Sequence, residues 1–279
     1  MKRYIALLLA LFTVAGIVLV SAPEASAESL YIRKIVSVVY DDSGSMEGEK
    51  HAYANYAMQA FCGMLNSEDQ LYITRMSDSV SRKIDLSASG IQNSVDAIHD
   101  YKAKGGTPFG AVEVAFNKLK SVKDDNPNTQ YWLVVITDGD FKSGTDGTGK
   151  SFLNGKMQEY VQTPMPNGSY PQVNFLAIGD SVISPDKNEK QGIYTYAANT
   201  AEEITREMAA LADRISGRTR LQSNHITQLD SRTIQVSSSI PLLNIAVLVQ
   251  ASNAKISKSA REVRLPKPWL PMLVSVDGR

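Results

Sequence analysis

Five oxygen-bearing side chains stand in three short polar segments of the chain. Asp41, Ser43 and Ser45 lie in a segment that reads DDSGSM at residues 41–46, Thr107 follows two glycines, and Asp138 stands in the tripeptide TDG at residues 137–139. Carboxylates and hydroxyls are hard oxygen ligands, and such a set selects Mg²⁺, Ca²⁺ or Mn²⁺ over zinc. We predict a divalent cation at these residues, with Mg²⁺ as the first choice and Mn²⁺ or Ca²⁺ as alternatives.

The mixture of charged and neutral ligands has a consequence for binding. If the hydroxyls take the direct positions around the cation, its positive charge is left partly uncompensated. Such a cation attracts one more carboxylate from outside. We therefore expect a protein partner that supplies an acidic residue to the metal.

The elements around these segments alternate between strands and helices. Nearly continuous apolar runs predict buried strands, and apolar residues at spacings of three and four predict amphipathic helices. We expect strands at 31–40, 71–76, 80–86, 131–137, 173–178 and 193–197, and helices at 49–65, 91–101, 107–122, 151–162 and 200–217. Thr107 would cap the third helix with Pro108 at its first position, and the capping box Thr200-Ala201-Glu202-Glu203 opens the last helix.

This order predicts an α/β fold, which is Rossmann-like and doubly wound, with a mostly parallel central sheet and helices on both faces. In such folds ligands bind at the carboxyl ends of the strands. The three polar segments each follow a predicted strand or open a helix, so all three can meet at one edge of the sheet.

At this point the chain resembles a known family. Asp41, Ser43 and Ser45 fit the D-x-S-x-S motif of von Willebrand factor A and integrin I domains, and Thr107 and Asp138 match the later threonine and aspartate of that family. The resemblance covers residues 31–217 and implies a metal-ion-dependent adhesion site (MIDAS). It implies that Ser43 and Ser45 bind the metal directly and Thr107 directly or through water. Asp41 and Asp138 would hold metal-bound waters or, for one of them, the metal itself.

The two ends of the chain differ in residue pattern from its middle. Lys2 and Arg3, an apolar run over residues 5–20 and the small residues Ala25-Ser26-Ala27 are typical of a secretory signal peptide cleaved after Ala27, with an uncleaved membrane anchor as the alternative. We predict a signal peptide at 1–27, a von Willebrand factor A-like domain at 30–218 and a β-rich C-terminal segment at 219–279. In that last segment we expect β structure at 233–237 and 245–250. We therefore expect an extracytoplasmic or cell-surface protein with no membrane span after cleavage.

Composition narrows the class of partner. Lys and Arg together number 29, as do Asp and Glu, so the chain has no excess of positive charge that would favour nucleic acid as a partner.

Cys62 is the single cysteine, which excludes an intrachain disulfide, and its apolar neighbours indicate a buried helix residue.

Enzymatic alternatives fit the sequence poorly. Residues 42–45 also resemble the D-[ST]-G-[ST] turn of aspartic proteases, but no second such turn occurs and that class is all-β. A haloacid-dehalogenase phosphatase needs an aspartate at position 43, which is Ser43, and His51, His99 and His225 are not placed for a Ser-His-Asp hydrolase. Asp42 occupies a variable position of the family motif and is not an expected ligand. We predict a non-enzymatic adhesion or protein-binding module; the alternative is an accessory subunit of a larger envelope assembly, ahead of a hydrolase.

Overall fold

The structure is a computed structural model that describes part of the chain. The described residues are 32–87, 90, 93–94, 97–98, 105–139, 141, 149–180 and 182–217, together with three strands near the C-terminus. The predicted signal peptide, most of the predicted helix at 91–101 and the predicted strand at 245–250 lie outside these residues. None of the helices among these residues combines the length and the hydropathy that a membrane span requires.

A mixed sheet of six strands forms the centre of the domain, in the order β3-β2-β1-β4-β5-β6. Strands β1, β2, β4, β5 and β6 run parallel, and β3 pairs antiparallel with β2 at one edge. The strands are β1 (Lys34–Tyr40), β2 (Gln70–Arg75), β3 (Ser81–Ile84), β4 (Gln130–Thr137), β5 (Gln172–Ile178) and β6 (Ile193–Ala198). All six predicted strands of this sheet are therefore present, and β2 and β3 form an antiparallel hairpin.

The two central strands are buried along almost their whole length. Every residue of β1 is buried, and in β4 only Gln130 is partly exposed. A strand covered on both faces needs apolar side chains on both, which explains the continuous runs KIVSVVY and QYWLVVIT. These strands place residues 41 and 138 next to each other, because Tyr40 pairs with Ile136 at the carboxyl ends.

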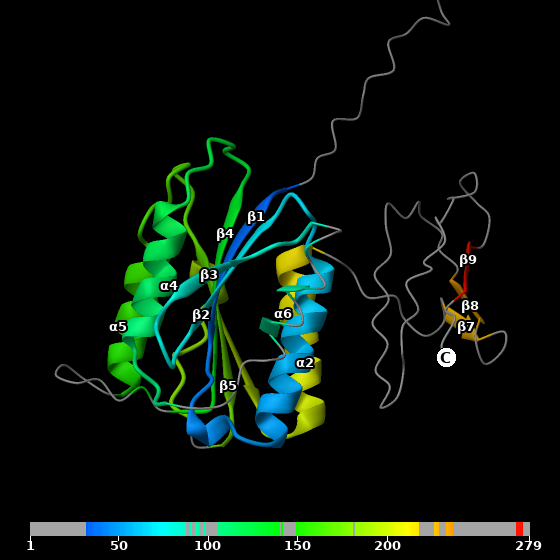
Figure 1. The fold of residues 1–279 in the computed structure, drawn as a ribbon. Helices are drawn as coiled ribbons and strands as arrows, with labels where there is room; N and C mark the ends of the chain where they lie inside the picture. Colours follow the sequence, from blue (N-terminus) through cyan, green and yellow to red (C-terminus); the bar gives the residue numbers. More distant parts are fainter. Residues whose placement is uncertain are drawn as a thin grey trace, which may run out of the picture. The chain divides into compact units, whose positions relative to one another are not determined.

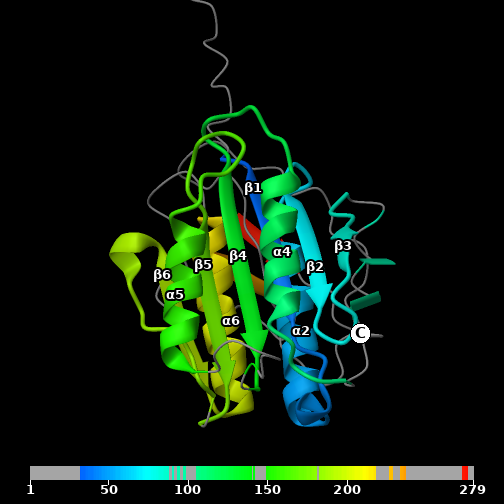
Figure 2. The ribbon, with the colours of Figure 1, turned by 90° about the vertical axis from the view of Figure 1, so that its left-hand side faces the viewer.

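Helices cover both faces of the sheet (Figures 1 and 2). One face packs against α2 (Glu49–Met64) and α6 (Ala201–Ser216), with Met58, Phe61 and Met208 in the shared core. The other face packs against α4 (Gly110–Ser121) and α5 (Lys150–Val161). The doubly wound α/β fold expected from the sequence is confirmed. An α/β fold of this kind differs from the all-β fold that the aspartic-protease alternative requires.

Two predicted helix starts had different outcomes. The residue before α6 is Thr200, whose hydroxyl accepts a hydrogen bond from the Glu203 amide at 3.2 Å, and the helix ends at Gly217 with a left-handed φ of 67°. The prediction that Thr107 caps α4 was wrong. Helix α4 begins at Gly110 with Phe109 at the capping position and no side-chain cap. The Thr107 hydroxyl therefore does not cap the N-terminus of α4.

A separate antiparallel sheet follows the domain in the sequence. It consists of β7 (Ile226–Gln228), β8 (Thr233–Val236) and β9 (Met272–Ser275), in that order. Strand β8 confirms the β structure predicted at 233–237. Strands β7 and β9 were not predicted, because their short segments carry no clear alternation of apolar and polar residues.

Candidate metal site

Three loops meet at the carboxyl ends of the central strands. The Asp41 amide continues the ladder beyond β1 by donating to the Ile136 carbonyl at 3.0 Å. The next loop includes the short 3₁₀ helix η1 (Gly44–Met46), and the Gly44 amide donates to the Gly105 carbonyl at 3.3 Å. Met46 is fully buried and anchors this loop in the core. The segments before α4 and after β1 are thus joined directly, as the sequence predicted.

Asp41 forms the buried floor of the site. Its Oδ1 accepts the Ser43 amide at 2.9 Å, and its Oδ2 accepts the Thr137 hydroxyl at 2.6 Å and the Asp138 amide at 3.3 Å. The side chain is fully buried. Burial raises the pKa of this carboxyl above its usual range, while the hydrogen bonds from Ser43 and Thr137 act in the opposite direction. The carboxylate is held in one orientation before any ligand arrives.

The hydroxyls and the second carboxylate form a continuous chain of contacts. Ser43 Oγ lies 3.0 Å from Ser45 Oγ, and the Ser45 hydroxyl donates to Asp138 Oδ1 at 2.7 Å. Ser43 is buried, whereas Ser45 is exposed. These three side chains therefore lie close enough together to share one ion, with the exposed end at Ser45.

Thr107 reaches the cluster through Gly139. A Cβ atom built on Gly139 would lie only 2.7 Å from Thr107 Oγ1, so the threonine hydroxyl stands directly against the Asp138–Gly139 turn. Gly139 has no left-handed φ, which leaves this close approach as the reason for a glycine there. The hydroxyl that does not cap α4 is directed to the site instead.

Lys50 is a member of the site that sequence reasoning missed. It lies in the first turn of α2, and its Nζ is 2.8 Å from Asp138 Oδ2. The Asp138 side chain is 1% exposed, whereas that of Lys50 is 44% exposed. One carboxylate therefore meets a hydroxyl on one oxygen and an ammonium on the other. Nothing in the local sequence indicates this pair, because its members are 88 positions apart.

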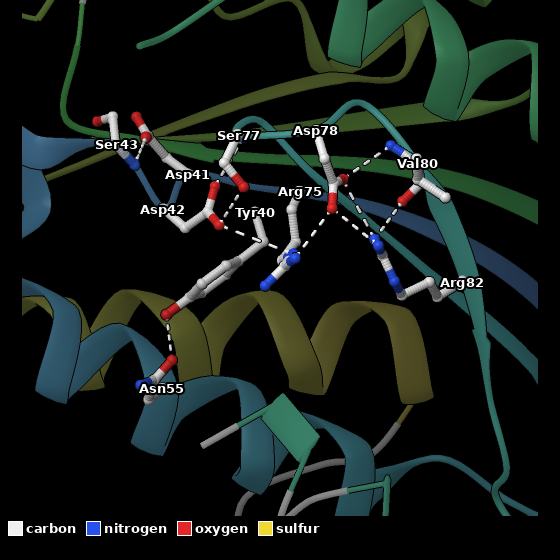
Figure 3. Close-up of polar contacts among 10 residues, drawn as sticks. All are labelled: Tyr40, Asp41, Asp42, Ser43, Asn55, Arg75, Ser77, Asp78, Val80 and Arg82. Carbon is white, nitrogen blue, oxygen red and sulfur yellow. Dashed lines mark hydrogen bonds and ion pairs between the residues drawn. The ribbon is translucent and has the colours of Figure 1, made fainter. Parts of the chain in front are cut away.

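Asp42 points toward Ser77 and Arg75 and not toward Ser43 (Figure 3). Its Oδ1 accepts the Ser77 amide at 2.8 Å, and its Oδ2 accepts the Ser77 hydroxyl at 2.6 Å. Arg75 Nε lies 3.8 Å from the same carboxylate, and Asp42 is fully buried. Both oxygens of Asp42 are therefore engaged with Ser77. This gives the residue a positioning role that the sequence did not reveal.

The arrangement suits a hard cation by its donor set. All five residues predicted from the sequence lie at one edge of the sheet, four of them linked by hydrogen bonds and Thr107 placed against Gly139, and every side-chain donor is an oxygen. Across the described residues, no group of three or more His, Cys, Asp or Glu side chains is placed to hold a metal. The present set differs from such groups because three of its members are hydroxyls. In charge, its two carboxylates exceed the single ammonium of Lys50.

Comparison with known proteins agrees with this description. Residues 36–141 match the family model of the von Willebrand factor type A domain. A von Willebrand factor type A protein from Catenulispora acidiphila is similar in structure, with a TM-score of 0.50 and 15% identity over 67% of this chain and 43% of that chain. At this identity the likeness shows the fold. No curated protein matches the sequence.

Two further solved structures show weaker likeness. The VWA domain of SpRpn10 has a TM-score of 0.47 and 10% identity, over 68% of this chain and 100% of that chain. Proximal thread matrix protein 1 from the mussel byssus, with a zinc-occupied MIDAS motif, has a TM-score of 0.42 and 13% identity, over 65% of this chain and 47% of that chain. The present chain spans less than half of the Catenulispora and mussel proteins. Residues 36–141 therefore match the von Willebrand factor type A domain, and the described domain shares the fold of the Catenulispora protein.

Proposed function

We propose that this protein is a non-catalytic binding module that holds an acidic residue of a protein partner through a divalent cation, with Mg²⁺ as the first choice. One observation carries the proposal. Asp41, Ser43, Ser45, Thr107 and Asp138 come from three separate loops and lie at one sheet edge. Contacts of 2.7–3.0 Å join the first three residues to Asp138, and Thr107 lies against Gly139, next to Asp138. Burying polar side chains costs free energy of folding, so stability alone does not explain why these groups are gathered. Their gathering points to a ligand.

The exposure of the five side chains supports binding from outside. Asp41, Ser43 and the side chain of Asp138 are buried, Thr107 is half-buried and Ser45 is exposed. Gly44, Gly105 and Gly106 are exposed as well and carry no side chains over the site. The site therefore has a rigid buried floor and an open rim through which a partner can approach.

The charges support an acidic partner. Asp41 and Asp138 supply two negative charges, the hydroxyls of Ser43, Ser45 and Thr107 supply none, and Lys50 compensates part of the charge of Asp138. When bound, the cation supplies a Lewis-acid position that accepts a carboxylate oxygen from outside. The residues of this chain would bind the remaining coordination positions of the cation and so keep the open position directed at the partner. The N-terminal segment, with its signal-peptide pattern, supports an extracytoplasmic location for this module.

A two-stage binding experiment tests the proposal. Calorimetric titration of the purified domain with Mg²⁺ is expected to show one site, which Ser43→Ala and Thr107→Ala weaken by about 10-fold or more. NMR titration with a short peptide containing a single Asp is then expected to shift signals near Ser45 and Thr107 in Mg²⁺ but not in chelator. A peptide with Asn in place of Asp is the matched control.

Two results would contradict the proposal. The first is unaltered Mg²⁺ affinity in both variants while their circular dichroism spectra stay native, because the hydroxyls would then be irrelevant to the cation. The second is peptide binding that persists in chelator or does not distinguish Asp from Asn.

A further inference from the structure

The ion pair between Lys50 and Asp138 places a cation of the protein's own on a proposed metal ligand. Lys50 Nζ lies 2.8 Å from Asp138 Oδ2, while Asp138 Oδ1 accepts the Ser45 hydroxyl at 2.7 Å. We propose that Lys50 sets the divalent-cation affinity of this site by competing for Asp138. This inference rests on the proposed function, since it concerns the same site.

The surroundings of Asp138 make the competition effective. The Asp138 side chain is 1% exposed, so water screens little of its interaction with a nearby charge. A second cation close to the same carboxylate repels the ammonium under these conditions. The ammonium and a divalent cation therefore weaken one another's hold on Asp138.

The surroundings of Lys50 allow it to leave. Its side chain is 44% exposed and has a flexible four-carbon stem, so the ammonium can exchange its contact with Asp138 for water without moving α2. Among the residues that the structure describes, Asp41 has no comparable competitor, since its oxygens accept hydrogen bonds from Ser43, Thr137 and Asp138. The competition is thus directed at one ligand of the five.

A different role for Lys50 predicts the opposite result. If the ammonium served to orient Asp138 for the cation, removing it would leave a misplaced carboxylate and weaken cation binding. If Lys50 competes, removing it strengthens cation binding. The sign of the change in Mg²⁺ affinity separates the two roles.

Calorimetric titration with Mg²⁺ alone measures this sign. We expect Lys50→Met and Lys50→Gln to bind Mg²⁺ about 3- to 5-fold more tightly than the wild type, which is the upper end for one partly exposed ion pair. Lys50→Arg keeps the charge and is expected to stay within about 2-fold of the wild type. Lys123→Met, at an exposed position in the loop after α4, is the control for the loss of a surface lysine.

Thermal unfolding provides a second readout. In chelator, Lys50→Met is expected to unfold at a lower temperature than the wild type, because the buried Asp138 carboxylate loses its partner; Mg²⁺ is expected to raise its unfolding temperature by more than that of the wild type. Equal or weaker Mg²⁺ binding by Lys50→Met and Lys50→Gln, with normal binding by the wild type, would overturn this inference alone. Absence of Mg²⁺ binding by the wild type would overturn the proposed function and this inference with it.

Discussion

The substitution Gly139→Ala places a methyl group where the Thr107 side chain lies. The added Cβ would be 2.7 Å from Thr107 Oγ1, 3.3 Å from its Cβ and 3.4 Å from its Cγ2. The first distance is shorter than any ordinary carbon–oxygen contact, so Thr107 must move by about half an ångström or change its rotamer. The backbone of Gly139 does not itself require glycine, because its φ is not left-handed. The perturbation therefore acts first on Thr107, which supplies the three atoms nearest to the added methyl group.

Its size follows from the burial of Thr107. Inserting a methyl group into a packed region costs about 1–3 kcal/mol. Thr107 is half-buried and can yield, so we expect a loss near 1 kcal/mol, which lowers the unfolding temperature of a domain of this size by about 2–4 °C. Displacement of the threonine hydroxyl is expected to reduce Mg²⁺ affinity by about 10-fold or more, on the proposed function.

Urea unfolding and Mg²⁺ calorimetry of the same preparation measure both effects. Gly106→Ala is the matched control, because a Cβ there meets no atom within 4 Å although the position adjoins Thr107. If Gly139→Ala matches this control in both stability and Mg²⁺ affinity, Thr107 does not lie against Gly139 and the convergence of the third loop is wrong.

Three further predictions concern residues around the site and in the core. Ser77→Ala removes the 2.6 Å hydrogen bond to the buried Asp42 and should cost about 1–3 kcal/mol in urea unfolding; unchanged stability would show that Asp42 needs no such partner. Burial raises the pKa of the Cys62 thiol to about 12, so alkylation at mildly alkaline pH should be slow in the native protein and fast in urea, and rapid native labelling would contradict this. Hydrogen bonds from Arg82 and Arg75 hold the pKa of Asp78 well below its usual range. The ionised Asp78 therefore adds less than about 1 kcal/mol to the free energy of unfolding. This contribution is complete above the ordinary Asp pKa of about 3.9 and is lost as pH falls toward the lowered pKa. The stability difference between wild type and Asp78→Asn should shrink over that range, and a difference independent of pH would refute the assignment.

The sequence was informative where structure depends on local pattern. Strands β1 and β4 are continuous apolar runs because both of their faces are covered, and a run of this kind is visible without any tertiary knowledge. The meeting of Asp41 with Asp138 followed from a rule about the carboxyl ends of parallel strands. The central sheet and the gathering of the five candidate ligands were therefore predictable.

The sequence was uninformative where structure depends on contacts between distant residues. Lys50 and Asp138 are 88 positions apart, and Asp42 and Ser77 are 35 apart, so neither pair leaves a local signal. Thr107 before Pro108 is a good capping sequence, yet α4 begins at Gly110 and the hydroxyl faces Gly139. Local helix propensity was overridden there by the packing of the loop.

The most direct test of the account is an anomalous difference map from crystals of this domain grown with Mn²⁺. We expect a single strong peak bounded by Ser43 Oγ, Ser45 Oγ and the carboxylates of Asp41 and Asp138, with metal–oxygen distances of about 2.0–2.3 Å for the direct ligands. The central claim is that these side chains form a cation site. A map from well-diffracting crystals with no peak at this cluster, or with the ion bound elsewhere, would contradict it.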